Sequence, residues 1–545
     1  MARRGMRGAR IGLALGLAVA GLIVLGGLSA RQSALATTLT VRDVSAIDFE
    51  FVPPVITITT GSSVRWTNNG SFPHTSTGDT GLWNSGTLNA GDMFTQTFDT
   101  PGAYGYYCAF HGSPGFGMAG RVVVVSSTLT VCPSCTYTTI DAALQAAANG
   151  DLIRVASGAY SERLTITKTV TLEGGWNESF TTRAPGTSVI DAQRAGRVMT
   201  VLGLVSPTID GFTITGGNAV TELSGAHQGG GVYIQTGGAL LVNNIITNNL
   251  ATTSAISTEV GFGGGVFVDS GRVVISANQI VSNVAGAAEA GAGTQGYGGG
   301  VYASGSPTLI NNLIVNNHAR TGGAFTGYGG GANVSNGVIR GNWFISNSAS
   351  HGGGIAIADN SMFEGNLSRG TSGGNHLVDV NGTRRVANNF LLESNCPVAI
   401  GVHGSAEIVN NTIVGCYDGV SLLSGAPVVS NNLFYSNVTA ILADTTPVLD
   451  YNGFWMNGTD FTVPTGTLTG THNVFSNPLF VDPAAGDYHL QIGSPMIDRG
   501  TSAGAPSTDY DGQARPTGEG VDIGADEVVP TYATYLPVVL KAFGP

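Results

Sequence analysis

Four side chains in the N-terminal part of the sequence have the types and spacing of ligands for a soft metal ion. Cys108, His111 and Met118 lie in one short stretch, and His74 lies upstream in a separate segment. Thiolate and thioether sulfur suit Cu(I), imidazole nitrogen serves both Cu(I) and Cu(II), and a weak axial thioether completes a site of this kind. The donor set therefore predicts one copper ion bound by His74, Cys108, His111 and Met118.

The segments around these four residues alternate apolar and polar side chains, as half-buried strands do. About seven short strands fit into residues 38–125, and this number predicts a β-sandwich. The clearest of them are 55–58, 63–66, 94–98, 104–107 and 121–125. A rigid sandwich would hold the ligands in one geometry for both oxidation states, so little rearrangement would accompany electron transfer.

Further motifs surround the four ligands. Asn68-Asn69-Gly70 leads to Pro73-His74, Ser85-Gly86 and Gly91-Asp92 follow, and 97–108 reads Thr-Phe-Asp-Thr-Pro-Gly-Ala-Tyr-Gly-Tyr-Tyr-Cys. Segment 37–127 resembles the plastocyanin/amicyanin group of cupredoxins. The resemblance implies a Greek-key β-sandwich, a type 1 (blue) copper site and one-electron transfer through a solvent-accessible His111. One departure concerns the axial ligand, because six residues separate His111 from Met118, more than a plastocyanin would have.

The residues flanking Cys108 bear on whether the site is catalytic. Multicopper oxidases resemble cupredoxins, but histidines flank their blue-site cysteine and lead to a trinuclear cluster. Here Tyr107 and Ala109 flank Cys108, and the sequence has no His-x-His pair. We therefore expect an electron carrier rather than an enzyme, with no catalytic residues and one type 1 copper as the only cofactor. Tyr107 either offers an electron route to the surface, as the resemblance implies, or packs as an aromatic side chain.

The N-terminus and the net charge predict where the protein works. Four arginines within residues 3–10 precede the apolar run 11–28, and Ala34-Leu35-Ala36 offers a cleavage site, so residues 1–36 are predicted to be a signal peptide. The apolar run is also long enough for an uncleaved membrane anchor. A net charge of −12 argues against nucleic acid or an anionic membrane surface as a partner. We expect a secreted or surface-displayed protein.

The long C-terminal part of the chain is built from a repeat marked by a recurrent asparagine. The residues three positions before it and two positions after it form two apolar columns, broken only by Ser368. Such columns are expected when each repeat is one coil of a parallel β-helix that stacks like residues inward. The asparagines would form a ladder at a bend, where they tolerate left-handed backbone. They are Asn244, Asn278, Asn312, Asn342, Asn366, Asn389, Asn411, Asn432 and Asn452.

The repeat resembles the right-handed β-helix of the pectin-lyase-like superfamily, so the expected fold class is all-β throughout. We assign residues 128–175 to an N-terminal cap with an amphipathic helix over 137–150, and residues 176–475 to the β-helix. Residues 476–529 are assigned to a C-terminal capping module, whose acidic cluster is expected to serve capping rather than calcium binding. The tail 530–545 is either a packing strand or a surface-sorting signal.

Four cysteines remain besides Cys108, and an oxidising compartment would favour disulfides among them. Cys132 and Cys135 form a Cys-x-x-Cys motif without a thioredoxin-like pattern around it, so a structural disulfide is the preferred interpretation. Cys396 and Cys416 lie one coil apart. They are either disulfide-bonded neighbours or two buried thiols.

Charged side chains of the repeat do not form a catalytic pattern. The paired carboxylates of a glycosidase are not recognisable, and neither are the calcium-binding aspartates of a lyase. The densest patch falls at unrelated repeat positions and is interpreted as solvated loop charges; it comprises Asp359, Glu364, Arg369, His376, Asp379, Arg384 and Arg385. Trp343 and Trp455 either stack on sugar rings or fill the stack of coils.

Together these features predict a copper electron carrier whose β-helix is a scaffold or an adhesion or carbohydrate-binding region. Its partners would be a redox donor and a redox acceptor protein, with cell-surface polysaccharide as a further candidate ligand. Two alternatives stay open. One is a polysaccharide-binding or polysaccharide-degrading β-helix with an auxiliary copper domain, and the other is extracellular copper sequestration.

Overall fold

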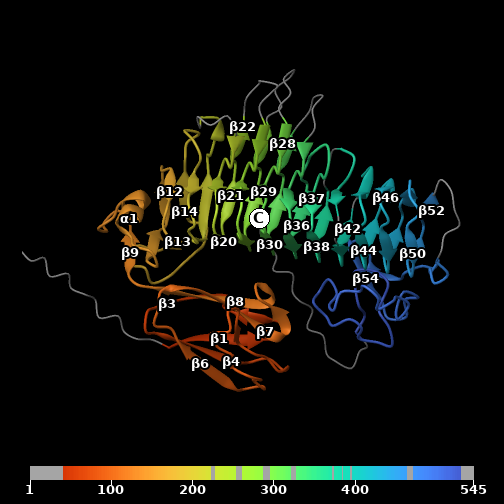
Figure 1. Ribbon diagram of the computed structural model, residues 1–545, viewed down its shortest axis with the longest axis horizontal. Helices are drawn as coiled ribbons and strands as arrows, with labels where there is room; N and C mark the ends of the chain where they lie inside the picture. The colour runs from red at the N-terminus through yellow and green to blue at the C-terminus, as the bar shows by residue number, and fades with distance from the viewer. Residues whose placement is uncertain are drawn as a thin grey trace, which may run out of the picture. The chain divides into compact units, whose positions relative to one another are not determined.

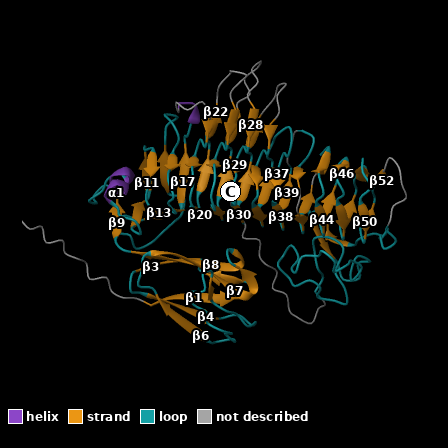
Figure 2. Ribbon diagram, viewed as in Figure 1, coloured by secondary structure: helices purple, strands orange, loops and turns teal. Residues whose placement is uncertain are grey.

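The computed structural model describes residues 41–221, 227–252, 260–286, 295–320, 327–370, 374–382, 385–392, 396–462 and 470–529. The predicted signal peptide and the predicted C-terminal tail lie outside these residues. Strands make up nearly all the regular structure of the described residues, so the all-β fold class is confirmed (Figure 1, Figure 2). None of the described helices is both long enough and apolar enough to cross a bilayer.

Within the described part of the chain, residues 41–125 form a β-sandwich of two four-stranded sheets. The strands of the first sheet, in spatial order, are β2 (Glu50–Val52), β1 (Val41–Ile47), β4 (Ser63–Asn68) and β6 (Met93–Thr97). Those of the second are β3 (Val55–Thr59), β8 (Phe116–Val125), β7 (Gly102–Ser113) and β5 (Thr77–Gly78). Val64, Trp66, Tyr106 and Val122 are completely buried in the core between the sheets. All five strands that the sequence pattern indicated are present.

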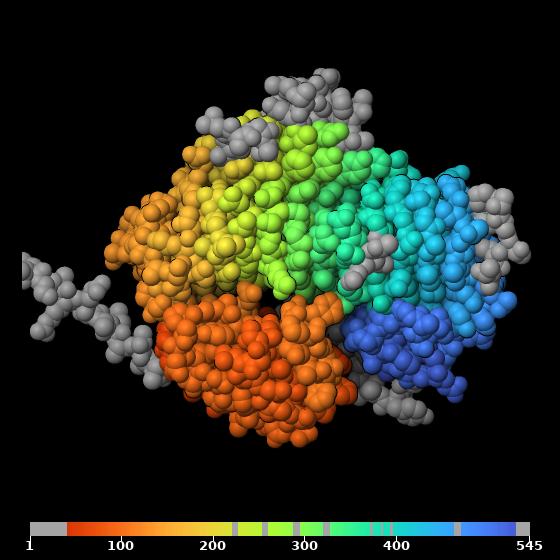
Figure 3. All heavy atoms as spheres, viewed as in Figure 1, coloured from red at the N-terminus to blue at the C-terminus, as the bar shows by residue number. Residues whose placement is uncertain are grey.

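From residue 128 the chain winds into a parallel β-helix (Figure 1). Among the described residues, a 13-stranded sheet runs from β9 (Thr128–Val131) to β50 (Val448–Asp450). Two 12-stranded sheets run from β11 (Gly158–Tyr160) to β51 (Gly453–Trp455) and from β12 (Leu164–Ile166) to β52 (Thr459–Thr462). In the space-filling view, successive coils form successive bands of colour (Figure 3). The β-helix is confirmed, and its sheets begin within the segment that we assigned to an N-terminal cap.

The two apolar columns of the repeat line the interior of the β-helix. Every residue three positions before a recurrent asparagine, from Leu241 to Leu449, is completely buried. The residues two positions after it are at most 2% exposed, and Ser368 is buried with them. Trp343 is partly buried, whereas Trp455 is exposed at the end of β51. The spacing of apolar residues therefore identified the core of each coil correctly.

The recurrent asparagines form the predicted ladder. Oδ1 of Asn312 accepts hydrogen bonds from the backbone N–H and Nδ2 of Asn278, at 3.0 and 3.1 Å. Nδ2 of Asn312 donates to the Ile275 carbonyl and to Oδ1 of Asn342, both at 2.8 Å. The left-handed residue of each bend is the one before the asparagine, with φ between +53° and +63°, as at Asn311. This differs from the prediction because one residue turns the backbone while the next directs its amide into the ladder.

A second asparagine ladder lies five residues further along the coil, and the sequence analysis missed it. Oδ1 of Asn283 accepts from the N–H and Nδ2 of Asn249, and the next coils repeat the pattern. The residues of this ladder are Asn249, Asn283, Asn317 and Asn347, and further on Asn437 and Asn457. Its signal was present in the sequence as a second asparagine at a constant offset from the first.

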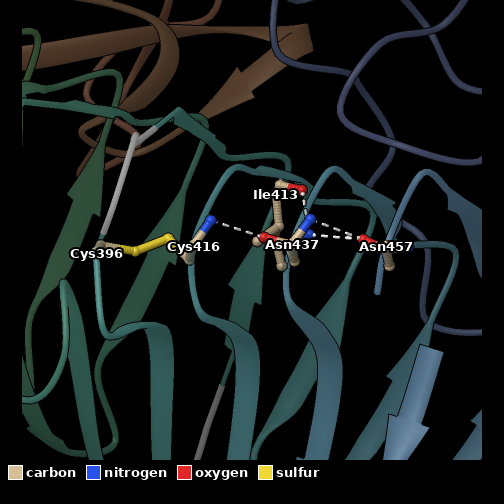
Figure 4. Close-up of a disulfide and its surroundings, with 5 residues drawn as sticks. All are labelled: Cys396, Ile413, Cys416, Asn437 and Asn457. Atoms are coloured by element: carbon tan, nitrogen blue, oxygen red, sulfur yellow. Dashed lines mark hydrogen bonds between the residues drawn. A yellow bond between two sulfur atoms is a disulfide. The ribbon is translucent and has the colours of Figure 1, made fainter. Parts of the chain in front are cut away.

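Cys416 stands at the position that asparagine occupies in other coils of the second ladder. Its N–H donates to Oδ1 of Asn437, and its sulfur is bonded to Cys396 (Figure 4). The pair that the sequence left open is therefore a disulfide between adjacent coils. Cys132 and Cys135 are also disulfide-bonded, as predicted.

The amphipathic helix is shorter than predicted. Helix α1 spans Ile140–Ala146 and ends where Ala147 takes extended backbone, before Gly150. Lys168 donates from Nζ to three carbonyl groups at this end, at 2.7–2.9 Å. The amine therefore satisfies acceptors that a longer helix would have bonded internally. Ile140 is completely buried against the first coils.

Residues 470–529 pack against the last coils of the β-helix. Met496 and Ile523 form a small apolar cluster with Leu433. Asn410 and Asn431, which precede ladder asparagines, donate to backbone carbonyls of this module. Its acidic residues are engaged internally: Glu527 pairs with Arg515 at 3.0 Å, both completely buried, and Asp522 accepts backbone N–H groups. These contacts favour the capping role over calcium binding.

The carboxylates around His489 predict that the stability of this C-terminal module depends on pH. Burial opposes its charge, but Asp511 and Asp487, which contact its two ring nitrogens at 3.0 and 2.5 Å, and nearby Asp526 raise the pKa of His489 to about 10. The unfolded chain releases this proton above about pH 6.5. The contribution of His489 to the free energy of unfolding is therefore complete below that pH and is lost as the pH rises toward 10.

We therefore expect urea-dependent proteolysis of residues 476–529 to need less urea at pH 9 than at pH 6.5. Burial also raises the pKa of Asp509 to about 8, which acts in the same direction. His489→Gln should accordingly weaken the pH dependence without abolishing it. The same slope in the variant as in the native chain would contradict the role of His489.

Candidate metal centre

Three of the four predicted ligands converge at one end of the β-sandwich. Nδ1 of His74 lies 3.7 Å from Sγ of Cys108, and Nδ1 of His111 lies 3.4 Å from the same sulfur. Two ligands on one first-row metal ion, with bonds of about 2.3 Å to sulfur and 2.0–2.1 Å to nitrogen, lie roughly 3.6–3.8 Å apart. The observed separations therefore suit a single ion shared by the thiolate and both imidazoles.

The loop before β5 places His74. Asn68, at the end of β4, is completely buried, and its side chain donates to the carbonyls of Phe72 and Leu88 and accepts from the N–H of Gly70. His74 also exchanges two backbone hydrogen bonds with Leu88. The Asn-Asn-Gly motif thus holds the loop so that the imidazole points inward, and His74 is completely buried.

Thr75 connects the two ligand-bearing segments. Its backbone N–H points at Sγ of Cys108 at 3.4 Å, and its hydroxyl accepts from the N–H of Ala109 at 2.8 Å. Cys108 is completely buried and is the one free cysteine among the described residues. The N–H group stabilises negative charge on the sulfur, and hydrogen bonds to the cysteine sulfur are among the features that tune a type 1 site. The sequence analysis did not identify Thr75.

The long ligand loop is a hairpin extension rather than an open loop. After an irregular stretch that contains Cys108 and His111, strands β7 and β8 resume pairing at Gly112↔Gly117 and Ser113↔Phe116. Gly117 has φ +67°, and a side chain there would clash with the His111 carbonyl at 2.6 Å. The extra residues therefore pair with each other and return the chain to Met118. That residue is 2% exposed and lies in the same core cluster as Cys108.

Burial favours the neutral form of both imidazoles. Burial lowers the pKa of His74, and the neighbouring His111 lowers it further, while Asp48 acts in the opposite direction. Burial likewise lowers the pKa of His111, opposed by Asp48. Oδ1 of Asp48 lies 3.8 Å from Nε2 of His74, on the side away from the sulfur. Neutral imidazoles can bind a metal ion without first losing a proton.

His111 lies at the edge of the site, within an exposed apolar surface. Phe49, Phe72 and Phe110 are 46%, 50% and 55% exposed. The ring of Phe49 contacts His111 edge-on at 5.1 Å and Phe72 at 5.8 Å, and Phe110 lies 6.2 Å from His111. We call these three residues the phenylalanine rim. Sequence reasoning missed it because scattered phenylalanines normally belong to a core.

The donor set fits type 1 copper. A buried thiol, two neutral imidazoles and a buried thioether are the N₂S ligands and weak axial group of such a site. Tyr107 is partly exposed and lies in β7, where it pairs with Thr77 of β5. The arrangement can bind one copper ion away from water and leave one ligand, His111, next to the protein surface.

The sequence analysis interpreted the charged patch of the β-helix as solvated loop charges, but the structure shows that some of these residues are buried. Asp359 and Arg369 are exposed, and Arg384 lies outside the described residues. Glu364, however, is buried and pairs with Arg340 and Arg385 of the adjoining coils. His376 and Asp379 are only 7% and 6% exposed. Offsets along the chain concealed these contacts because the coils differ in length.

Residues 39–125 match the family described as copper-binding proteins of the plastocyanin/azurin family. The chloroplastic plastocyanin of Tetradesmus obliquus is 38% identical over 126 residues, which cover 21% of this chain and 81% of that protein. The plastocyanin of Scenedesmus fuscus is 39% identical over 93 residues, which cover 15% of this chain and 91% of that protein. Among solved structures, a purple cupredoxin from Nitrosopumilus maritimus is 32% identical, covers 15% of this chain and 97% of that chain, and has a TM-score of 0.14.

Proposed function

Because the chain belongs, through residues 39–125, to the plastocyanin/azurin family of copper-binding proteins, we propose that it is an exported carrier of single electrons. The observation on which this proposal depends is the approach of both imidazoles to the buried Cys108 sulfur, next to an apolar surface. A bound copper ion would supply the Cu(II)/Cu(I) couple.

The residues of the sandwich have separate tasks in this proposal. Cys108, His74 and Met118 bind the ion in the interior and exclude water from it. Thr75 and Asn68 keep the two ligand-bearing segments in place, so the same geometry serves both oxidation states. His111 is the ligand through which an electron enters and leaves, because its ring is in contact with the surface residue Phe49.

The phenylalanine rim is the proposed docking surface for the redox donor and the redox acceptor. An exposed apolar patch of this kind marks a binding site, and a dry contact shortens the electron path to His111. A partner that fits this surface would itself present an apolar face. Short-lived docking suits a carrier that must release each partner after one electron.

Export is part of the proposal. The arginine-rich, apolar and Ala-x-Ala segments of residues 1–36 have the order of a signal peptide. Two disulfides, Cys132–Cys135 and Cys396–Cys416, suit an oxidising compartment. The β-helix would then serve as a rigid scaffold that presents the copper domain outside the cell.

The function is tested on the full chain loaded with one equivalent of Cu(II). We expect an intense visible copper–thiolate band and a reversible one-electron wave in voltammetry, both of which follow from a thiolate-bound ion in a fixed site. Tight copper binding without a reversible wave would favour copper sequestration. Depolymerisation of a polysaccharide by the copper-free chain would favour the alternative of a polysaccharide-degrading β-helix.

Met118→Leu tests the axial ligand, about which the ligand spacing raised a question. An axial thioether stabilises Cu(II) more than Cu(I), so its removal should raise the reduction potential. We expect a retained blue band and a potential raised by at least about 60 mV, which for one electron is a tenfold change in relative affinity. Met93→Leu, at a 61% exposed position of the same sandwich, is the matched control. Equal potentials for the two variants would remove Met118 from the ligand set.

A further inference from the structure

Two adjacent strands of the β-helix carry polar side chains on their outer face. β40 (Val378–Gly382) and β43 (Val398–His403) are parallel neighbours, with Asp379 opposite Gly401 and Asn381 opposite His403. The alternate residues Val378, Val380, Ile400 and Val402 belong to the apolar core. Since side chains alternate along a strand, Asp379 and His403 lie on the outer face, yet Asp379 is only 6% exposed.

The side chain that covers Asp379 is His376. A Cβ atom at Gly401 would lie 2.2–2.5 Å from the atoms of the His376 ring, so the imidazole occupies the space that glycine leaves open. The ring of His403 follows at a centroid distance of 6.1 Å, and the ring of His351, on the preceding coil, lies 6.2 Å away on the other side. Three imidazoles thus line up along successive coils, with one carboxylate among them.

The separations within this cluster are too long for hydrogen bonds. Oδ1 of Asp379 lies 3.6 Å from Nδ1 of His376 and 3.8 Å from Nε2 of His403. Nδ1 of His376 and Oδ1 of Asp379 are buried without a hydrogen-bond partner in the described part of the chain. Leaving such groups unsatisfied costs about 1–3 kcal/mol each, so a ligand bound by both atoms would stabilise this arrangement.

We propose that His376, Asp379 and His403 form a second metal site, which binds a divalent transition ion of the Zn²⁺ class. Nitrogen and oxygen ligands with bonds of 2.0–2.2 Å lie roughly 3.3–3.6 Å apart around such an ion, close to the observed separations. All three ligand atoms lie within 4.8 Å of one another. The site has no sulfur, so its chemistry differs from that of the copper centre.

The fourth position of the proposed site faces solvent. The side chain of His403 is 45% exposed, whereas those of His376 and Asp379 are 8% exposed. The ion can therefore enter from the surface, and it would keep one position for water or an external ligand. Two imidazoles, one carboxylate and a water molecule are a known ligand combination for zinc.

A second cluster of similar composition does not qualify. His489, Asp511 and Asp526 also lie close together in the C-terminal module. Both ring nitrogens of His489, however, contact carboxylates at hydrogen-bonding distance, 2.5 Å from Asp487 and 3.0 Å from Asp511. Nδ1 of His489 is hydrogen-bonded to Asp487, whereas Nδ1 of His376 and Oδ1 of Asp379 have no hydrogen-bond partner in the described part of the chain, which distinguishes the two clusters.

The test uses the full chain with its copper site filled by one equivalent of copper and kept reduced with ascorbate. Zn²⁺ is added by equilibrium dialysis, and bound metals are counted by elemental analysis. We expect one tightly bound Zn²⁺ per chain and an unchanged blue band after reoxidation. His403→Ala and Asp379→Asn should each weaken Zn²⁺ binding more than about 100-fold, since changes beyond the ligands themselves already cost 10–100-fold.

His472→Ala is the matched control. His472 is likewise exposed beside an aspartate, Asp450, but the pair is hydrogen-bonded at 2.9 Å and has no third ligand among the described residues. This variant should bind Zn²⁺ as the native chain does. Native-like Zn²⁺ affinity in His403→Ala, or no Zn²⁺ bound by the native chain, would overturn the proposal.

Gly401→Ala provides an independent readout that changes none of the three ligand residues themselves. Its Cβ would displace the imidazole of His376, so we expect the same loss of Zn²⁺ affinity. In the native chain, Zn²⁺ should also raise the thermal midpoint of the β-helix, because a ligand that binds only the folded state stabilises it. Gly401→Ala with full Zn²⁺ affinity would show that His376 is not a ligand.

Discussion

Cys108→Ser should abolish the blue band and the one-electron wave while the sandwich stays folded. The hydroxyl of serine is a hard donor that stays protonated, so it supplies neither the charge-transfer band nor the softness that Cu(I) requires. The change replaces one buried sulfur, in the core cluster that also contains Met118, with a smaller oxygen atom, so the core loses little. The visible spectrum and voltammetry of the copper-loaded chain measure the effect.

The control for this prediction removes other sulfur atoms. Cys132→Ser with Cys135→Ser eliminates a disulfide just beyond the sandwich and should leave the blue band unchanged. Far-ultraviolet circular dichroism would verify that the Cys108 variant keeps its strands. A blue band in Cys108→Ser would mean that the thiolate is not a ligand, and the proposed function would fail with it.

Asn312→Ala should destabilise the β-helix by about 4 kcal/mol. Its side chain makes hydrogen bonds to three neighbouring residues, Asn278, Ile275 and Asn342. Without it, the N–H of Asn278 and the carbonyl of Ile275 remain buried and unpaired, at about 1–3 kcal/mol each. The urea midpoint of the full chain, followed by circular dichroism, measures the loss.

Asn360→Ala separates the ladder from a general effect of losing asparagine. Asn360 lies on the exposed surface of the same β-helix, outside both ladders. Its replacement should change stability by less than about 0.5 kcal/mol, as surface substitutions usually do. If Asn312→Ala were as mild as Asn360→Ala, the ladder would not be a source of stability.

The two metal centres would differ in how the fold builds them. The copper centre draws its ligands from a loop and an irregular hairpin of the sandwich, held by Asn68 and Thr75. The proposed second centre takes Asp379 and His403 from regular strand positions and His376 from the residues just before β40, and the stacking of coils sets the spacing between them. Function on the β-helix thus depends on which residues become neighbours across coils.

Much of the molecule was predictable from local patterns. Alternation of apolar residues identified the sandwich strands, and the spacing of Cys108, His111 and Met118 identified their shared segment. The constant offsets around the recurrent asparagine identified the buried columns of every coil. These features are readable because they repeat with the period of the strand or of the coil, and each depends on residues close together in sequence.

Only the tertiary structure decided the rest, because those features depend on distances between residues far apart in sequence. Three features depend on contacts between separate strands or coils. They are the approach of Asp48 to His74, the phenylalanine rim, and the position of the His376 ring over Gly401. Inserts of unequal length conceal which residues meet, so His403 gave no signal beside Asp379. The spacing of the asparagines predicted a ladder but not which residue turns the backbone. Only the structure shows that the residue before each asparagine takes the left-handed conformation while the asparagine directs its amide into the ladder.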